Sequence, residues 1–453
     1  MFYLIVVIFI LGYSAIALEH TIKVDKAAAA LLTAVAVWVC IIFGGESIFS
    51  GTGELAESSH SSLPDFVHSL LIEHLGATGE IIFFLLGAMT IVEIIDTHGG
   101  FNVLSKIIKT ISKRKLIWIF SFLTFFMSAV LDNLTTTIVM IALMRKLVGG
   151  KNTRWFFASM IVIAANAGGA WSPIGDVTTI MLWIGGQITA VNIILKVFVP
   201  SLMCMIVPLL IVSFTLKGTA IPPSRSDRAK SIVPTSDKER LIILLAGVGG
   251  LLFVPVFKSV THLPPYLGIL LVLSLMWIIT EILHRGKQKD LRVRLSLTYI
   301  LQKIDTPTIL FFLGILMAVA GLESAGHLRM LSTFLDEKIH NVYAINLAIG
   351  FLSSIVDNVP LVAGTMGMYG IVPAGVTDPY MANFTVDGTF WEFLAYCAGT
   401  GGSLLIIGSA AGVAAMGILK MDFMWYLRKV TLLAITGYLA GAGVYWLMFN
   451  LLL

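Results

Sequence analysis

Hydrophobic residues occur in long, nearly uninterrupted runs that are separated by short polar segments. A transmembrane helix needs about 20 mostly apolar residues, and about ten runs approach that length. They cover approximately 2–18, 27–44, 79–97, 155–185, 190–216, 241–257, 265–283, 307–323, 390–416 and 430–450. The first run has no basic segment before it and no cleavage site after it, which predicts a retained helix. The pattern predicts an all-α polytopic membrane protein with about ten transmembrane helices.

Two further apolar stretches, 116–149 and 341–371, contain a repeated phrase. Residues 128–135 read SAVLDNLT, and residues 353–360 read SSIVDNVP. Each copy places an Asp-Asn pair in the middle of an apolar stretch. A carboxylate is expensive in that environment, so an ionisable residue within a membrane segment indicates a functional site.

The positions of Lys and Arg predict that these two stretches are re-entrant helical hairpins. Basic residues flank 116–149 on both sides, which places both of its ends in the cytoplasm. A limb such as 116–131 is about 24 Å long at about 1.5 Å per residue, which is short for a hydrocarbon core of about 30 Å. Two short full spans remain the alternative. The stretch 341–371 has few basic neighbours, so its ends are expected outside.

The two halves of the chain also match outside the hairpins. FFLLG at 83–87 resembles FFLG at 311–314, and the glycines of 168–175 recur at 401–408. The matching halves, of opposite orientation, predict an inverted-topology repeat with a site at the midplane, as in secondary transporters. The predicted parts are an N-terminal repeat, a basic cytoplasmic linker and a C-terminal repeat: 1–216, 217–240 and 241–453. The acidic stretch 45–78 is expected to be an external loop, and the basic stretch 284–303 an amphipathic cytoplasmic segment or a solvated loop.

The hairpin tips carry the first candidate ligands. A chain that turns at Asp-Asn exposes free carbonyls and amides beside side-chain oxygens, and such oxygens suit a hard cation. The alternative is that Asp and Asn only cap the re-entrant helices. The candidate ligands of the tips are Asp132, Asn133, Thr135, Asp357 and Asn358.

A second set of polar residues interrupts the run 155–185. Glycines, Ser172-Pro173 and Asp176 favour a broken helix, and a break would expose backbone beside side-chain oxygens. The candidate ligands here are Asn166, Asp176, Thr178 and Thr179. The matching segment of the second half keeps the glycines and has no carboxylate. A simple kink with a helix cap is the alternative.

Three polar residues near the end of the run 79–97 are candidates for a proton path or pH sensing. Glu93 and Asp96 lie within or at the end of the run, and His98 follows it. A structural hydrogen-bonded pair explains the two carboxylates equally well. Histidine titrates near neutral pH, although a lone interfacial histidine is usually only interfacial.

Composition limits the class of function. Hydrophobic residues make up 57% of the chain and charged residues 12%, against about 25% charged residues in soluble proteins. The three cysteines have neither metal-site nor disulfide spacing. We expect no enzyme activity, no cofactor and no nucleic-acid partner. A buried carboxylate can be neutralised by a proton or by Na⁺, and competition at Asp132, Asp176 and Asp357 would couple the two flows.

At these motifs the chain resembles the NhaD-type sodium/proton antiporters of the ion transporter superfamily. The resemblance rests on 90–101, 128–137, 166–179 and 353–360. It implies an antiporter of the bacterial inner membrane that exchanges Na⁺ or Li⁺ for H⁺ at alkaline pH, serves pH homeostasis and forms a homodimer in the lipid bilayer. It also adds Ser128 and Ser353 to the tip and broken-helix residues implicated in transport.

Two other classes compete with this interpretation. Sodium-coupled dicarboxylate carriers of the same superfamily share the layout, but their hairpin tips typically begin Ser-Asn-Thr, whereas Asp in both tips here repels an anion. An intramembrane aspartyl protease also needs two aspartates in the membrane. Its Gly-x-Gly-Asp pattern is absent, since residues 173–176 read PIGD.

Overall fold

The computed structural model describes residues 1–49, 62–103, 108, 110–216, 218–220 and 235–451. Within this part of the chain, the regular structure is helical apart from two isolated β-bridges. Eight described helices are long and apolar enough to cross a membrane. They are α3 (Lys26–Phe49), α5 (Leu63–Thr97), α7 (Lys113–Leu131), α11 (Ala190–Thr215), α12 (Asp237–Thr261), α13 (Pro265–His284), α16 (Thr306–Ser324) and α23 (Thr431–Leu451). The prediction of an all-α polytopic membrane protein is confirmed.

Further helices complete the spans, the hairpins and the connections. Those of the first apolar run, the hairpins and the broken helices are α1 (Phe2–Ala17), α8 (Asn133–Leu147), α9 (Lys151–Ala170), α10 (Val177–Ile184), α18 (Val342–Leu352), α19 (Asn358–Met368), α20 (Thr389–Gly401) and α21 (Ala410–Leu419). Those of the connections are α2 (Glu19–Ile22), α14 (Lys289–Arg294), α15 (Leu297–Leu301), α17 (His327–Lys338), η2 (Met381–Phe384) and α22 (Phe423–Lys429).

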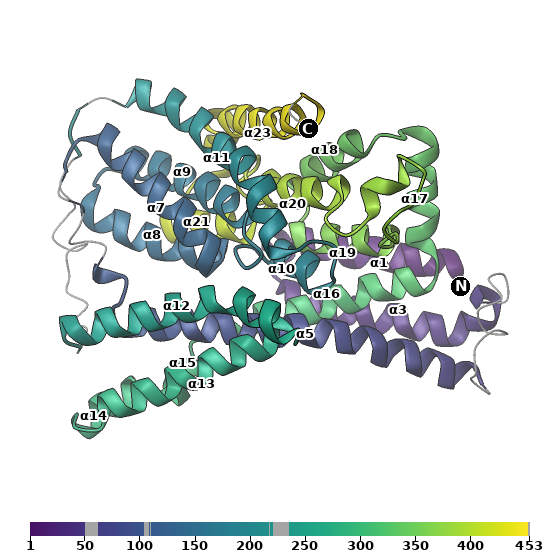
Figure 1. Cartoon of the computed structure of the whole chain (residues 1–453), viewed down its shortest axis with the longest axis horizontal. Coiled ribbons are helices and arrows are strands. Elements are labelled where there is room, and N and C mark those ends of the chain that lie inside the picture. The colour runs from purple at the N-terminus through teal and green to yellow at the C-terminus, as the bar shows by residue number, and fades with distance from the viewer. Residues whose placement is uncertain (50–61, 104–107, 109, 217, 221–234, 452–453) are drawn as a thin grey trace.

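The helices form two layers, which lie above and below one another in Figure 1. The lower layer, here called the scaffold layer, contains α1, α3, α5, α12, α13 and α16. The upper layer, here called the hairpin layer, contains α7 to α11 and α18 to α23. In the scaffold layer α3 packs against α16, and α13 packs against α5. In the hairpin layer α11 packs along α23.

Packing within the hairpin layer follows the internal repeat. Helix α7 packs on α9 as α18 packs on α20, while α8 contacts α21 as α19 contacts α10. Glycines allow these close approaches. A Cβ on Gly168 would lie 2.2 Å from the carbonyl oxygen of Phe125, and one on Gly401 would lie 2.1 Å from that of Gly350. The two contacts are separated by 225 residues on one side and 233 on the other, the spacings of the sequence repeat.

In both hairpins the chain doubles back at the tip, and hydrogen bonds place the hairpin ends beside neighbouring helices. Arg114, near the start of α7, donates to the carbonyl of Ser213 near the end of α11, and Lys146 at the end of α8 donates to Asn102, just past the end of α5. The ends of the first hairpin thus lie beside the final turns of two spans. In the second hairpin, Tyr369 follows α19 and donates to Asp336, close to the start of α18.

Three segments differ from the sequence-based expectation. The stretch 45–78 is not all loop, because α3 continues to Phe49 and α5 begins at Leu63, where Ser62 accepts a hydrogen bond from the Asp65 amide. The run 390–416 is broken into α20 and α21. Residues 327–338 form α17, which the low hydrophobicity of that stretch concealed.

The predicted linker, 217–240, lies mostly on residues 221–234, which are outside the described residues. Helix α12 already begins at Asp237, because Ser236 and Glu239 form a reciprocal capping box. The division into repeats at 217–240 therefore stays a prediction. In the basic stretch 284–303, α14 and α15 form two short helices.

Candidate functional site

The asparagines of the two hairpin tips converge on one carboxylate. Asn133 Nδ2 lies 3.0 Å from Asp176 Oδ2, and Asn358 Nδ2 lies 3.3 Å from the same oxygen. All three side chains are at most 5% exposed. The sequence-predicted tips of both halves and the broken helix therefore meet at a single buried point, and Asp176 is its centre.

Asn166 extends this network into the second half of the chain. Its Oδ1 accepts a hydrogen bond from Asn133 at 3.1 Å, and its Nδ2 donates to the hydroxyls of Ser403 and Ser409 at 2.9 Å each. Asn166 is fully buried, so these bonds satisfy a polar group that burial would otherwise penalise. Both halves thus contribute polar atoms to one continuous network.

The predicted break between α9 and α10 places Asp176 at the start of a helix. Its side chain accepts from the Thr178 amide, while the Thr179 hydroxyl accepts from the Asp176 amide. The hydroxyl of Thr178 is buried and has no hydrogen-bond partner among the described residues. A buried oxygen without a partner is uncommon in native structures, so this hydroxyl is an unsatisfied polar group close to Asp176.

Asp132 holds the first tip in a strained backbone conformation. Its φ of 72° and ψ of 161° lie in a region that is populated almost only by glycine. Its carboxylate accepts from the amide of Thr135 at 2.8 Å and from the Thr135 hydroxyl at 2.7 Å. The capping alternative is thus realised at this tip, although the carboxylate also lines the cavity described below.

Asp357 at the second tip has a different environment. The helices α18 and α19 are separated by the five residues 353–357, and the Asp357 side chain makes no capping hydrogen bond. Its nearest charged partner is Lys26 at the start of α3, at 3.9 Å. The second tip therefore presents a carboxylate that the helix cap does not occupy.

The serines that precede each tip hold equivalent positions. Ser128 Oγ donates to the carbonyl of Ala165 at 2.6 Å, and Ser353 Oγ donates to the carbonyl of Ala398 at 2.9 Å. Both serines are fully buried. Each one joins a hairpin to the broken helix of its own half.

A small cavity of about 50 Å³ collects the site residues of both halves and the ends of two scaffold helices. Its polar lining residues are Lys26, Asp132, Asn133, Thr135, Asp176, Thr308, Asp357 and Asn358. The volume suits an ion with one or a few waters. Carboxylate, amide and hydroxyl oxygens are the donors that hard cations prefer.

Glu93 and Asp96 lie on α5, away from this cavity. Glu93 accepts from the Thr97 hydroxyl at 2.8 Å and lies 3.4 Å from Lys303. Glu93 and Asp96 are absent from the cavity lining. The structure thus separates this predicted group from the tip residues.

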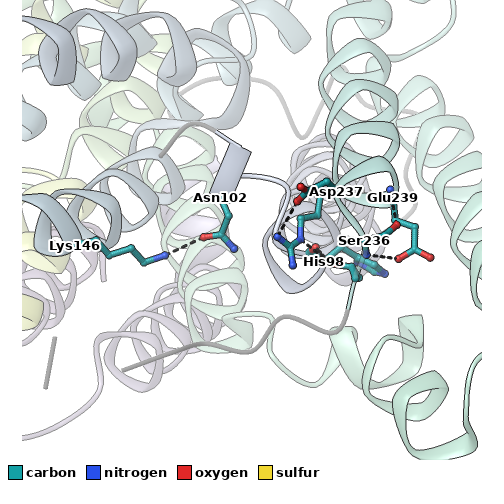
Figure 2. A network of polar contacts seen from close by, with 8 residues as sticks. His98, Asn102, Lys146, Ser236, Asp237 and Glu239 are labelled. Carbon is teal, nitrogen blue, oxygen red and sulfur yellow. Dashed lines mark hydrogen bonds and ion pairs between the residues drawn. The ribbon is translucent and has the colours of Figure 1, made fainter. Parts of the chain in front are cut away.

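His98 is buried just beyond the end of α5. Its Nδ1 lies 2.6 Å from the carbonyl of Ile94, and its ring stacks on His284 with centroids 4.9 Å apart. Figure 2 shows the surrounding polar network, in which the start of α12 approaches His98. Burial lowers the pKa of His98 to about 4, partly opposed by the contact with Ile94. The ring is therefore neutral across the neutral pH range.

Ser403, Ser409, Lys26 and Thr308 are site residues that the sequence reasoning did not select. A signal existed for Ser409, which lies 233 residues after Asp176 and caps α21 as Asp176 caps α10. Lys26 and Thr308 carried no signal, because each is the ordinary polar residue at the start of a membrane helix. Only the tertiary contact between the layers brings them to the tips.

Buried polar residues enclosed by apolar helices of spanning length are typical of a polytopic membrane transporter. A comparison with protein families matches residues 6–386 to CitMHS, described as citrate transporter, and the chain belongs to this family. It is 45% identical to sodium/proton antiporter 1 of Arabidopsis thaliana over 98% of this chain and 72% of that protein. It is 42% identical to sodium/proton antiporter 2 of the same plant over 98% of this chain and 99% of that protein.

Bacterial proteins are similar over the same length. The chain is 30% identical to the Na⁺/H⁺ antiporter NhaD of Vibrio cholerae over 98% of this chain and 91% of that protein. The resemblance to NhaD-type antiporters is therefore confirmed. The protein is a transporter and not an enzyme.

Proposed function

We propose that the protein exchanges Na⁺ for H⁺ across the membrane, with the cation held between the two hairpin tips and Asp176. The observation that carries this proposal is the meeting of both tips in one small cavity with three carboxylates, Asp132, Asp176 and Asp357. The names of the similar proteins, sodium/proton antiporters of plants and bacteria, point to the same pair of ions.

Coupling follows from charge. Three carboxylates in so small a volume repel one another, so a proton or a cation must offset part of their charge. Na⁺ is attracted by these carboxylates, while a proton neutralises one of them and weakens that site. If the cavity opens to each side in turn, one Na⁺ leaves only when protons take its place.

We assign the cation site to the residues of the tips, the broken helices and the flanking serines. The assigned residues are Ser128, Asp132, Asn133, Thr135, Asn166, Asp176, Thr178, Thr179, Ser353, Asp357 and Asn358. Protons are carried by Asp132, Asp176 and Asp357. Glu93 and Asp96 stay candidates for a proton path, and His98 for pH sensing, away from the cation cavity.

The finer expectations follow from the resemblance. We expect Li⁺ to be exchanged as well, because it is a hard cation of the same charge. We also expect a homodimer located in a bacterial inner membrane and a role in pH homeostasis. A cross-linking experiment in native membranes tests the dimer, and fractionation of the source cells tests the location.

The direct test uses proteoliposomes with an acidic interior and NaCl added outside at about pH 8.5. Internal alkalinisation with Na⁺ or Li⁺, and none with K⁺ or choline, supports exchange. Loss of that response in Asp132→Asn connects it to the first tip. A response to no cation contradicts the proposal.

Citrate transport is the second candidate, because the matched family carries that description. The cavity argues against it, since a tricarboxylate would enter a space of about 50 Å³ already lined by three carboxylates. Uptake of radiolabelled citrate by the same proteoliposomes distinguishes the two activities.

A further inference from the structure

A lysine of the scaffold layer reaches into the cation cavity. Lys26 is the first residue of α3, and its Nζ lies 3.9 Å from Asp357 Oδ2 at the second tip. The same ammonium lies 4.5 Å from the centroid of the Phe311 ring on α16. Two scaffold helices therefore hold a positive charge against a carboxylate of the hairpin layer.

This ion pair is weak enough to be replaced. The side chains of Lys26 and Asp357 are 28% and 20% exposed, and 3.9 Å is near the upper limit for a direct ion pair. Partly exposed pairs at such distances contribute little stability. A Na⁺ ion at Asp357, or a proton on it, would remove the attraction without a large cost.

The second half of the chain has no equivalent lysine. Gly314 of α16 packs on Ala30 of α3, and its counterpart Gly87 of α5 packs on Ile269 of α13. Residue 26 lies four positions before Ala30, and Pro265 lies four positions before Ile269. The charged Lys26 of the first half thus faces the second tip, whereas the uncharged Pro265 occupies the equivalent position in the second half.

We propose that Lys26 is a built-in counter-cation of the transport site. In the empty carrier with Asp357 ionised, its ammonium takes the place of Na⁺ beside Asp357 and holds the hairpin layer against the scaffold. Binding of Na⁺ or H⁺ at Asp357 releases this contact and permits the site to change sides. The empty, ionised carrier therefore changes sides less often, so less Na⁺ crosses without a returning proton. This proposal rests on the proposed sodium/proton exchange.

The charges around Asp357 come from several elements. Lys26 approaches from α3, and Asp132 and Asp176 line the same cavity from the first tip and the broken helix. Tyr13 of α1 also interacts electrostatically with Asp357. Among the polar residues of the cavity lining, Lys26 is the cationic one. Its replacement by an uncharged residue therefore makes the net charge of the cavity more negative by one unit.

The first test measures ²²Na⁺ binding to the purified protein at a fixed alkaline pH. Lys26→Met removes the competing ammonium, so the apparent Kd for Na⁺ should fall by about two- to fivefold, the upper part of the range expected for losing a weak ion pair. Lys26→Arg keeps the charge and should stay within about twofold of the unaltered protein. An unchanged or higher Kd in Lys26→Met overturns the proposal.

The matched control is Lys258→Met. Lys258 lies on α12, 4.6 Å from the Trp183 ring centroid, and donates to the Trp183 carbonyl across the same pair of layers. It does not line the cation cavity. Its removal should leave the Kd for Na⁺ unchanged, which separates a charge effect at the site from general loosening between the layers.

The second test measures coupling in proteoliposomes by recording ²²Na⁺ release and proton entry together. In Lys26→Met, Na⁺ should leave with fewer protons entering, and the ratio of Na⁺ to H⁺ should rise at least about twofold. A structural defect would lower both fluxes and leave their ratio unchanged, which overturns the proposal. If the unaltered protein shows no Na⁺-dependent proton movement, the proposed function itself fails.

Discussion

The two hairpin tips share a sequence and differ in how they use it. At the first tip a single residue, Asp132, separates α7 from α8, and its carboxylate is tied to Thr135. At the second tip five residues separate α18 from α19, and Asp357 faces Lys26. The two hairpins pack similarly on their broken helices, while the chemistry of the two tips differs. The Asp132 carboxylate is held by hydrogen bonds within its own hairpin, whereas the Asp357 carboxylate contacts a lysine of the scaffold layer.

The broken helices show the same asymmetry more strongly. Asp176 caps α10 and accepts hydrogen bonds from the asparagines of both tips. Its counterpart Ser409 caps α21 and accepts a hydrogen bond from Asn166. A side chain at Gly399, the counterpart of Asn166, would approach Ala170 and Asp176. One half thus supplies the central charge, and the other half leaves room for it.

The largest expected effect is at this pair. Asp176→Asn removes the central charge and should lower Na⁺/H⁺ exchange at least about 30-fold, since a buried hydrogen-bonded charge contributes roughly 2–5 kcal/mol. Ser409→Ala loses a neutral hydrogen bond of about 1 kcal/mol and should lower exchange less than about tenfold. Initial rates in proteoliposomes measure both. Equal losses would contradict the asymmetry.

The first tip allows strain and chemistry to be separated. Asp132→Gly and Asp132→Asn should both abolish most of the exchange, because both remove the carboxylate. Only glycine relieves the backbone, which costs about 1–3 kcal/mol at such angles, less about 0.5–1 kcal/mol for the added freedom of the unfolded chain. Thermal unfolding should therefore show Asp132→Gly as the more stable variant. The reverse order would mean that the tip is not strained.

The serines before the tips offer a matched pair. Ser128→Ala and Ser353→Ala each remove one buried hydrogen bond to a carbonyl, so each should lose about 1 kcal/mol of stability. Denaturation midpoints check that the two losses agree. A difference in the KM for Na⁺ between the two variants would show that one serine also binds the cation.

The smallest effect is expected at His98. Because burial lowers the pKa of His98 to about 4, its contribution to stability is present above about pH 6.5 and is lost as the pH falls towards 4. His98→Gln should leave the pH profile of exchange unchanged between pH 7 and 9 and flatten the loss of stability in acid. A shifted alkaline profile would instead support pH sensing by His98.

Much of this arrangement could be predicted from the sequence, because apolar runs, basic loops and the Asp-Asn repeat are local signals. The helices are interrupted at Asp132 and just before Val177, as the polar residues in these segments predicted. The helical residues 63–78 and α17 were not predicted. The first turns of α5 carry Asp65, His68, Glu73 and His74, and α17 is too polar to read as a membrane span.

The roles of Lys26 and Ser403 depend on contacts between segments hundreds of residues apart. Ser403 meets Asn166 across 237 residues, and Lys26 meets Asp357 only because α3 packs on α16 beneath the second tip. No single-sequence pattern records such contacts. Charge and hydrogen bonding at the centre of the site are therefore properties of the assembled fold.

The contacts at Gly168 and Gly401 have a mechanical consequence. Each brings the backbone of a broken helix against the backbone of a hairpin with no room for a methyl group. Because the two backbones are in direct contact, a displacement of one segment displaces the other. We therefore expect each hairpin and its broken helix to move as one rigid body when the site changes sides.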